Sequence, residues 1–182
     1  MVAGMALNFS SIGAAVRATL RFLGVLRQPA RTPLRGRPGS TPRLAAGVTG
    51  TYPGDFTGTA TLRYSPSPDG RPDPGEIVWT WVPFEEDHSR GKDRPVLLVG
   101  SHGRYLLGLM LTSKDHDGHP RARLDYVDVG TGTWDRKGRP SEAKLDRILQ
   151  IHPADIRREG SVLDRKKFRL VADELRRLHG WK

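Results

Sequence analysis

Glycine and proline interrupt this chain so often that it cannot consist of long helices: 21 glycines and 14 prolines occur among 182 residues. These two residue types mark turns and limit the elements between them to short runs. Several runs are rich in β-branched or aromatic residues and are typical of buried or half-buried β-strands. The predicted strands cover residues 76–82, 96–99, 105–111, 122–127 and 143–151, with a weaker edge strand at residues 59–64.

The end of the chain has the clearest pattern of an amphipathic helix. Its apolar residues recur every three or four positions and form one stripe, while lysine and arginine cover the other side. Ser161 or Asp164 is a suitable first cap, and Gly180 is a suitable end. Residues 152–158 have room for one or two helical turns, because Pro153 favours the first position of a helix. The residues of the stripe are Phe168, Val171, Ala172, Leu175 and Leu178.

Several short strands with one terminal helix predict a small, strongly bent sheet or barrel that packs against that helix. The charge distribution indicates where this domain begins. Residues 1–50 hold seven arginines and no acidic residue, whereas the rest of the chain holds 23 basic and 20 acidic groups. We therefore expect a basic extension and linker over residues 1–50 and one folded domain over residues 51–182. Because most of the net charge of +10 lies in the extension, charge alone says little about what the domain binds.

The basic extension permits three interpretations. Arg17 and Arg21 would share one face of a surface-seeking amphipathic helix, and the arginine-rich, acid-free composition is also typical of a transit peptide. We favour the third, an extension without fixed structure or residues upstream of the true start, so membrane contact through this tail is not expected.

No run of about 18 apolar residues predicts a membrane span. The absence of cysteine excludes disulfides and thiolate chemistry and is compatible with the cytoplasmic location that we expect.

The chain contains none of the common motifs for nucleotide binding, zinc proteases or serine hydrolases. The one candidate for a metal is the cluster at residues 115–119, which contains two histidines and two aspartates. All of these side chains belong to one tight turn, and the sequence offers no obvious ligand to complete a coordination sphere. We therefore interpret the cluster as a solvated hairpin turn and expect neither a metal nor a cofactor.

Two short segments place polar, cationic side chains at the end of an apolar run. In the first, Arg94 and Pro95 come directly before the buried run at residues 96–99, at the mouth of a long polar loop. An arginine in this position can bind a phosphate through two parallel hydrogen bonds from its guanidinium. The alternative is an ordinary surface ion pair with Asp93 or Glu86.

The second segment is Thr112, Ser113 and Lys114, which follows the apolar residues 109–111. Two hydroxyl groups and an ammonium at a strand end can stabilise an oxyanion or hold a phosphate. The alternative is a simple transition from strand to turn, where threonine and serine are common.

Four segments occur in an order that is specific when they are taken together. Residues 75–79 (GEIVW) are followed by a polar loop, by residues 94–99 (RPVLLV) and by residues 111–113 (LTS). Residues 143–152 (AKLDRILQIH) and the terminal amphipathic helix complete the series. The series, which spans residues 75–178, resembles the PemK/MazF family of toxin endoribonucleases from type II toxin–antitoxin systems.

The resemblance implies an SH3-like β-barrel with a C-terminal helix, and an enzyme that cleaves single-stranded RNA without a metal. Such a protein, an mRNA interferase, is expected to form a homodimer and to be bound by a cognate acidic antitoxin. By their positions in the family pattern, Arg94 and Thr112 are the expected catalytic residues, and Arg94 would mainly stabilise charge because arginine is a poor base. The expected RNA-binding residues are Ser113, Lys114, Lys92, Lys144, Asp146 and His88.

Departures from the family pattern leave the activity open. Lys144 and Asp146 match a late pair that serves catalysis or RNA contact in some members. Lys144 stands where that pair has an arginine, which removes the fork of a guanidinium. Some members have a glutamate, a candidate base, five residues before the motif arginine, and Ser89 stands at that position. The alternative function is a non-enzymatic protein- or nucleic-acid-binding module, since gyrase-poison relatives of the barrel show that fold does not fix activity. Several nearby residues leave the choice of a base open: Glu85, Glu86, Asp87 and His88.

Overall fold

The computed structural model describes residues 50–116 and 124–182. The interpretations of the basic extension and the part of the histidine-containing cluster after residue 116 lie outside these residues. The strands are β1 (Glu76–Pro83), β2 (Gly91–His102), β3 (Tyr105–Thr112), β4 (Tyr126–Gly130), β5 (Ser141–Ile151) and β6 (Ile156–Val162). A 3-10 turn (Pro153–Asp155) precedes β6, and the chain ends in the helix α1 (Arg165–His179).

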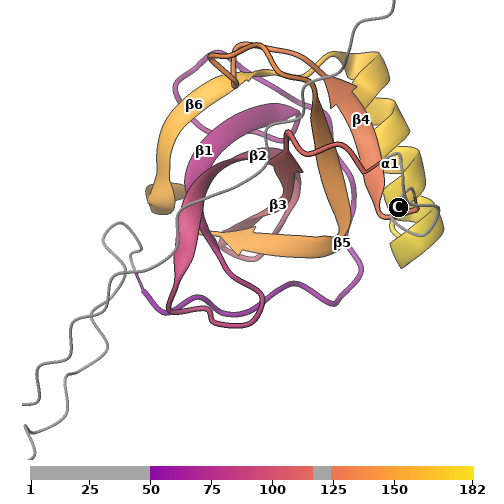
Figure 1. Cartoon of the computed structure of the whole chain (residues 1–182). Coiled ribbons are helices and arrows are strands. Elements are labelled where there is room, and N and C mark those ends of the chain that lie inside the picture. The colour runs from indigo at the N-terminus through magenta and orange to yellow at the C-terminus, as the bar shows by residue number, and fades with distance from the viewer. Residues whose placement is uncertain (1–49, 117–123) are drawn as a thin grey trace, which may run out of the picture. The chain divides into compact units, whose positions relative to one another are not determined.

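All six strands form one antiparallel sheet in the order β4-β5-β3-β2-β1-β6. The sheet curls into an open barrel, and α1 lies beside β4 and β5 (Figure 1). This arrangement confirms the predicted class, a small SH3-like barrel with a C-terminal helix. Within the described part of the chain, no helix is long and apolar enough to cross a membrane.

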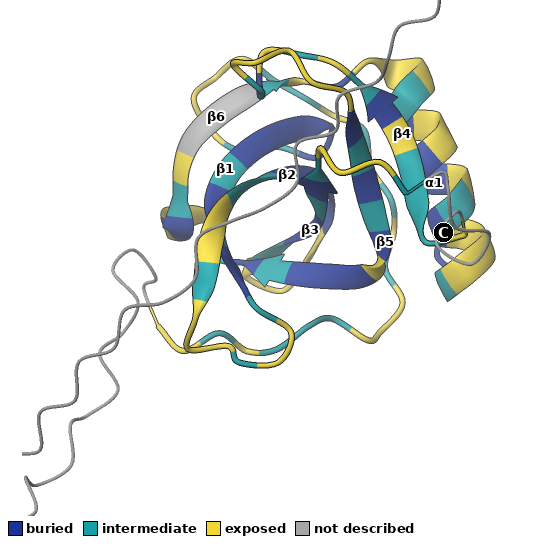
Figure 2. Ribbon diagram, in the orientation of Figure 1, coloured by how far each residue is buried: buried dark blue, intermediate teal, exposed yellow. Residues whose placement is uncertain are grey.

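The curved sheet buries apolar side chains on both of its faces. Side chains alternate between the two faces along each strand, so that Leu97 lies in the core under α1 while Val96 and Leu98 lie in a second core on the other face. Figure 2 shows the buried residues along β1, β2, β3 and β5 and the exposed outer side of α1. The side chains that α1 contributes to the larger core are Phe168, Val171, Ala172 and Leu175.

The helix agrees closely with its sequence pattern. Asp164, one of the two predicted caps, begins it, because its carboxylate accepts the backbone N–H groups of Lys166 and Lys167. Gly180 ends it with a φ of 65°, a left-handed conformation that glycine adopts without strain. Leu178, the last residue of the predicted stripe, is 37% exposed and lies at the edge of the buried surface.

Strand β2 begins much earlier than predicted, at Gly91 instead of residue 96. Its polar first half pairs with β1 up to the partners Pro83 and Gly91, so backbone bonds rather than apolar side chains hold this part of the strand. A side chain at residue 91 would collide with the Val82 carbonyl, and glycine is therefore required at this close approach. The long polar loop that the sequence predicted before Arg94 is correspondingly shorter and lies between Pro83 and Gly91.

Three further predictions about strands and turns differ from the structure. Residues 152–158 form only the 3-10 turn before they enter β6, a strand whose sequence IRREGSV lacks the alternation that would have revealed it. Strand β4 covers Tyr126–Gly130, whereas the predicted strand was residues 122–127, of which residues 122 and 123 lie outside the described part of the chain. Residues 59–64 form no strand, because their backbone bonds go to separate places in the chain.

We call residues 50–64 the strap. This extended segment is held by backbone hydrogen bonds: Phe56 N–H donates to Ile148 O at 2.8 Å, Leu62 N–H donates to Lys182 O at 2.7 Å, and Lys182 N–H donates to Ala60 O at 3.1 Å. The indole N–H of Trp181 also donates to Gly58 O. The strap therefore connects β5 and the end of the chain. The apolar side chains of the strap that pack against the larger core are Phe56, Ala60, Leu62 and Tyr64.

Candidate nucleic-acid interface

Arg94 and Thr112 lie on neighbouring strands of the sheet, Arg94 in the first half of β2 and Thr112 at the end of β3. In the antiparallel ladder between β2 and β3, Val96 lies opposite Met110. Arg94 comes two residues before Val96, and Thr112 comes two residues after Met110. Because side chains two residues apart share a face, both point to the side of Val96 and Met110, which is the side opposite α1. We call the surface around Arg94 and Thr112, on the side of the sheet opposite α1, the candidate face. By strand register and alternation it carries Lys92 and Arg94 of β2, Thr112 of β3, Glu142 and Lys144 of β5, and Tyr126 and Asp128 of β4.

The local setting of Arg94 differs from the sequence prediction. It lies within β2, opposite Thr80 of β1, and does not precede the strand. Within the described residues it forms no ion pair, and Asp93 instead binds Arg157 at 2.7 Å, so the alternative pairing of Arg94 with Asp93 or Glu86 is wrong. The half-buried Arg94 therefore keeps its guanidinium available for a bound anion.

Pro95 follows Arg94 inside the strand, although the sequence placed it at the strand start. It pairs with Trp79 of β1, while the pairing of β2 with β3 begins only at the next residue, Val96. A proline has no N–H to donate and is tolerated where a strand lacks a neighbour on one side. Pro95 therefore marks the point at which β3 leaves β2, which is also where Arg94 and Thr112 lie.

Thr112 ends β3 with its hydroxyl fixed by the following turn. The Oγ1 atom accepts the backbone N–H of Lys114 at 3.1 Å. Because this bond uses a lone pair of the oxygen, the O–H remains able to donate to an anion. Ser113 and Lys114 are both exposed directly beside it. Thr112 therefore shares the candidate face with Arg94, and Ser113 and Lys114 directly follow Thr112 in the chain.

Lys92 and His88 make no contact with Arg94 or Thr112 among the contacts of the described residues. Lys92 is exposed on β2, on the same side as Arg94, with its ammonium 5.8 Å from the centre of the Phe84 ring. His88 lies in the loop between β1 and β2, and its ring contacts Tyr52 of the strap edge-on at 5.0 Å. Lys92 thus extends the cationic surface next to Arg94, whereas His88 packs against the strap.

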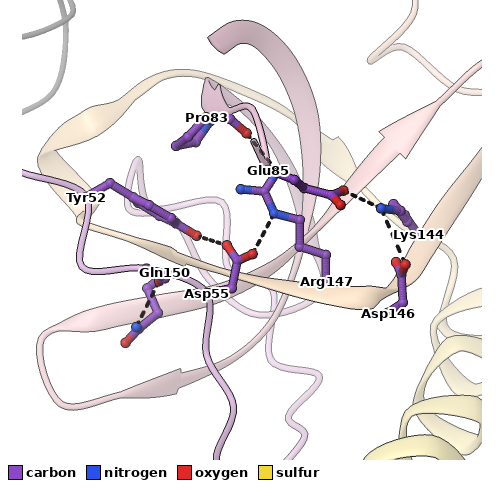
Figure 3. Close-up of polar contacts among 9 residues, drawn as sticks. Tyr52, Asp55, Pro83, Glu85, Lys144, Asp146, Arg147 and Gln150 are labelled. Atoms are coloured by element: carbon purple, nitrogen blue, oxygen red, sulfur yellow. Dashed lines mark hydrogen bonds and ion pairs between the residues drawn. The ribbon is translucent and has the colours of Figure 1, made fainter. Parts of the chain in front are cut away.

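Lys144 is already engaged by two carboxylates. Its ammonium binds Glu85 of the β1–β2 loop and Asp146 of its own strand, the latter at 3.4 Å (Figure 3). Burial alone would lower the pKa of Lys144, but the Glu85 hydrogen bond and the two negative charges outweigh it and raise that pKa. The predicted pair of Lys144 and Asp146 is therefore real, but Lys144 also holds the loop against β5.

A buried charge network that the sequence did not predict lies next to this pair. The side chain of Arg147 is only 6% exposed, and its Nε donates to Asp55 Oδ2 of the strap at 2.8 Å. Its Nη1 donates to Pro83 O at 2.7 Å, and the Tyr52 hydroxyl donates to the other oxygen of Asp55 at 2.5 Å (Figure 3). Asp55 and Arg147 are 92 residues apart, so no local signal in the sequence could have joined them.

Because of Tyr52, the free energy of unfolding should decrease at alkaline pH. Burial raises the pKa of Tyr52 well above its usual value, and the hydrogen bond to Asp55 raises it further. Above about pH 10 the unfolded chain ionises this tyrosine while the folded chain keeps the proton, so the unfolding free energy falls as pH rises. We expect Tyr52→Phe to cost about 1 kcal/mol at neutral pH and to remove part of that alkaline loss. Urea unfolding measured between about pH 7 and pH 11 tests this; an unchanged pH slope, with Tyr105→Phe as control, would contradict it.

His116 also occupies a setting that the sequence did not predict. Its Nδ1 lies 2.7 Å from Glu142 Oε2, and its ring stacks on Tyr126 with centroids 3.9 Å apart and planes 10° from parallel. Its side chain is 14% exposed, so the prediction of a solvated turn is wrong at this residue. The described residues contain no group of three or more potential metal ligands. A histidine between two aspartates was the only sequence signal for this site.

The fold and these side chains define a small antiparallel barrel protein with a cationic, hydroxyl-bearing surface on two neighbouring strands. The chain belongs to the PemK-like, MazF-like toxins of type II toxin–antitoxin systems, whose family model matches residues 73–179. A comparison with curated proteins found no match.

Two solved structures illustrate the likeness of fold. The Mycobacterium tuberculosis toxin MazF-mt6 is 16% identical, with a TM-score of 0.42 over 59% of this chain and 98% of that chain. A MazE–MazF crystal structure from Deinococcus radiodurans is 18% identical, with a TM-score of 0.45 over 63% of this chain and 100% of that chain.

Proposed function

We propose that this toxin is an mRNA interferase, an endoribonuclease that cleaves single-stranded RNA in the cytoplasm without a metal. The observation that carries the proposal is the register of β2 and β3, by which Arg94 and Thr112 share the candidate face. A guanidinium that forms no ion pair with the described residues and shares a face with a hydroxyl is suited to hold one phosphodiester. Membership of the toxin family supports the same reading.

The proposed reaction uses the 2′-hydroxyl of the RNA as nucleophile. A base removes its proton, the 2′-oxygen attacks the adjacent phosphorus, and negative charge builds on the non-bridging oxygens. Arg94 donates two hydrogen bonds to those oxygens and Thr112 donates one, which stabilises the transition state more than the ground state. The bond from phosphorus to the 5′-oxygen then breaks. The products carry a 2′,3′-cyclic phosphate and a 5′-hydroxyl, and DNA is not a substrate because it lacks the nucleophile.

The remaining predicted residues would bind the RNA on either side of the cleaved bond. Lys92, Ser113 and Lys114 are exposed next to Arg94 and Thr112 and would contact the flanking phosphates. Lys144 with Asp146, and His88 in the β1–β2 loop, would contact the strand further away. Cationic contacts to phosphates release counterions, so the binding should weaken as salt rises.

The partners follow from the proposed activity. A cognate antitoxin with an acidic segment would compete with RNA for the cationic candidate face, and a homodimer would present two such faces. The alternative function, a non-enzymatic binding module on the same barrel, is favoured by one observation. Glu85, a candidate base in the β1–β2 loop, is held by Lys144 and is therefore occupied.

The test uses the purified full chain, a mixed-sequence single-stranded RNA and excess chelator. We expect cleavage into fragments that end in a 2′,3′-cyclic phosphate, and no cleavage of the same strand with 2′-deoxy sugars. Absence of RNA cleavage would overturn the proposal. Capture of a defined protein target by a chain that does not turn over RNA would establish the alternative.

A further inference from the structure

The candidate face holds a histidine–carboxylate pair with two independent restraints. The Nδ1 atom of His116 lies 2.7 Å from Glu142 Oε2, and the backbone N–H of His116 donates to Glu142 Oε1 at 3.3 Å. The imidazole also stacks flat on Tyr126 of β4. Contacts from β4 and β5 therefore fix both the position and the plane of this ring.

This pair lies next to the proposed catalytic residues. Glu142 of β5 is the direct register partner of Thr112 of β3, and side chains at opposite positions of antiparallel strands lie on one face with Cβ atoms about 5 Å apart. His116 follows Thr112 by a short turn and reaches back to Glu142. The ring therefore lies over the same end of the sheet as the Thr112 hydroxyl and Arg94.

The chemistry of the pair suits proton transfer. When Nδ1–H donates to a carboxylate, the other ring nitrogen, Nε2, carries the lone pair and can accept a proton. The carboxylate also stabilises the imidazolium that results. Among the described residues no hydrogen bond occupies Nε2 of His116, whose side chain keeps 14% of its surface exposed.

We propose that His116 is the general base of the RNA cleavage, and that Glu142 is the positioning residue that orients it. This inference rests on the proposed function and supplies the base that the family pattern leaves vacant at Ser89. Two of the loop carboxylates are poorer candidates: Lys144 holds Glu85, and hydrogen bonds from Ser89 lower the pKa of Asp87. A carboxylate with a lowered pKa accepts a proton less readily.

The proton balance of the step is complete. His116 Nε2 takes the proton of the 2′-hydroxyl as the bond from the 2′-oxygen to phosphorus forms. As the bond from phosphorus to the 5′-oxygen breaks, that oxygen takes a proton from water. The imidazolium then returns its proton to the hydroxide that remains, and both the enzyme and the solvent are restored.

The charged and titratable groups that face His116 come from the neighbouring strands and from its own segment. Because histidine is the side chain that usually changes charge near neutral pH, the cleavage rate should fall on the acid side as the base becomes protonated. The facing groups are Glu142 and Lys144 on β5, Tyr126 and Asp128 on β4, Arg94 on β2, and Lys114 and Asp115 on its own segment.

The experiment measures RNA cleavage by the full chain, in chelator, as a function of pH. We expect His116→Gln to lower the rate at neutral pH by about 10²–10⁴-fold and to abolish the acid limb of the profile. Added imidazole should restore part of the rate of His116→Ala, because it supplies the missing base. His102→Gln, at the opposite end of β2, is the matched control and should leave the rate and the profile unchanged.

A second variant separates catalysis from folding. Glu142→Gln removes the negative charge next to the ring, so the acid limb should move to lower pH and the rate should fall, even if some stability is lost. If wild-type chain cleaves RNA while His116→Gln and Glu142→Gln keep its rate and pH profile, His116 only fixes the turn and the inference is wrong. If the wild-type chain cleaves no RNA, the proposed function fails and the inference fails with it.

Discussion

Replacing Arg94 with alanine is expected to lower the rate of RNA cleavage by about 10²–10³-fold, the usual effect of removing one preorganised donor from a developing oxyanion. The substitution removes a half-buried guanidinium that makes no ion pair within the described residues, so little stability should be lost. The measurement is the single-turnover rate on a defined RNA in chelator, with circular dichroism and thermal unfolding as checks of the fold.

Two further variants make this result specific. Arg94→Lys keeps the charge but not the planar fork, and should recover only a part of the rate. Arg104→Ala removes an exposed arginine from the other end of the same strand pair, where Arg104 contacts Tyr105, and should leave the rate unchanged. Cleavage by Arg94→Ala at the wild-type rate would remove Arg94 from the mechanism.

Replacing Asp55 with alanine is expected to lower the free energy of unfolding by about 3 kcal/mol. The change leaves the guanidinium of Arg147, 6% exposed, without the carboxylate that binds it among the described residues. It also removes the acceptor of the Tyr52 hydroxyl. A buried charge that loses its partner costs more than the pair itself contributes. We place the effect at the low end of the usual range because Asp55 itself is 31% exposed. Urea unfolding at neutral pH measures it.

A double variant and a surface control test the physical reason. Asp55→Ala combined with Arg147→Met removes both charges, and it should be more stable than Asp55→Ala alone because no charge remains buried. Asp173→Ala breaks an exposed ion pair with Arg176 on α1 and should cost less than about 1 kcal/mol. Equal losses for Asp55→Ala and Asp173→Ala would show that burial of Arg147 does not matter.

The sequence predicts the elements that carry strong local patterns. Helix α1 has a cap at Asp164, a stripe of apolar residues and an ending at Gly180, and each is a local feature. The central strands have continuous apolar runs that only a sheet buried on both faces accommodates. Strand β6 and the polar half of β2 lack such a pattern, because their backbone bonds to β1 hold them in place.

Only some residues of the candidate face could be predicted from the sequence. Family order points to Arg94 and Thr112, and the ladder between β2 and β3 explains why two residues so far apart in the chain share a face. The pair of His116 and Glu142 joins residues 26 positions apart. It depends on the register between β3 and β5, which no short segment encodes. The same holds for the contact between Asp55 and Arg147.

The strap has a consequence for where this toxin can be shortened. The family match begins at residue 73, so a truncation designed on homology would delete Asp55 and uncover both Ile148 and the Trp181 indole. In such a fragment the buried guanidinium of Arg147 would lack its carboxylate partner Asp55, and apolar side chains that the strap covers would be exposed to solvent. We therefore expect it to aggregate. The smallest autonomous unit should therefore start at or before Tyr52.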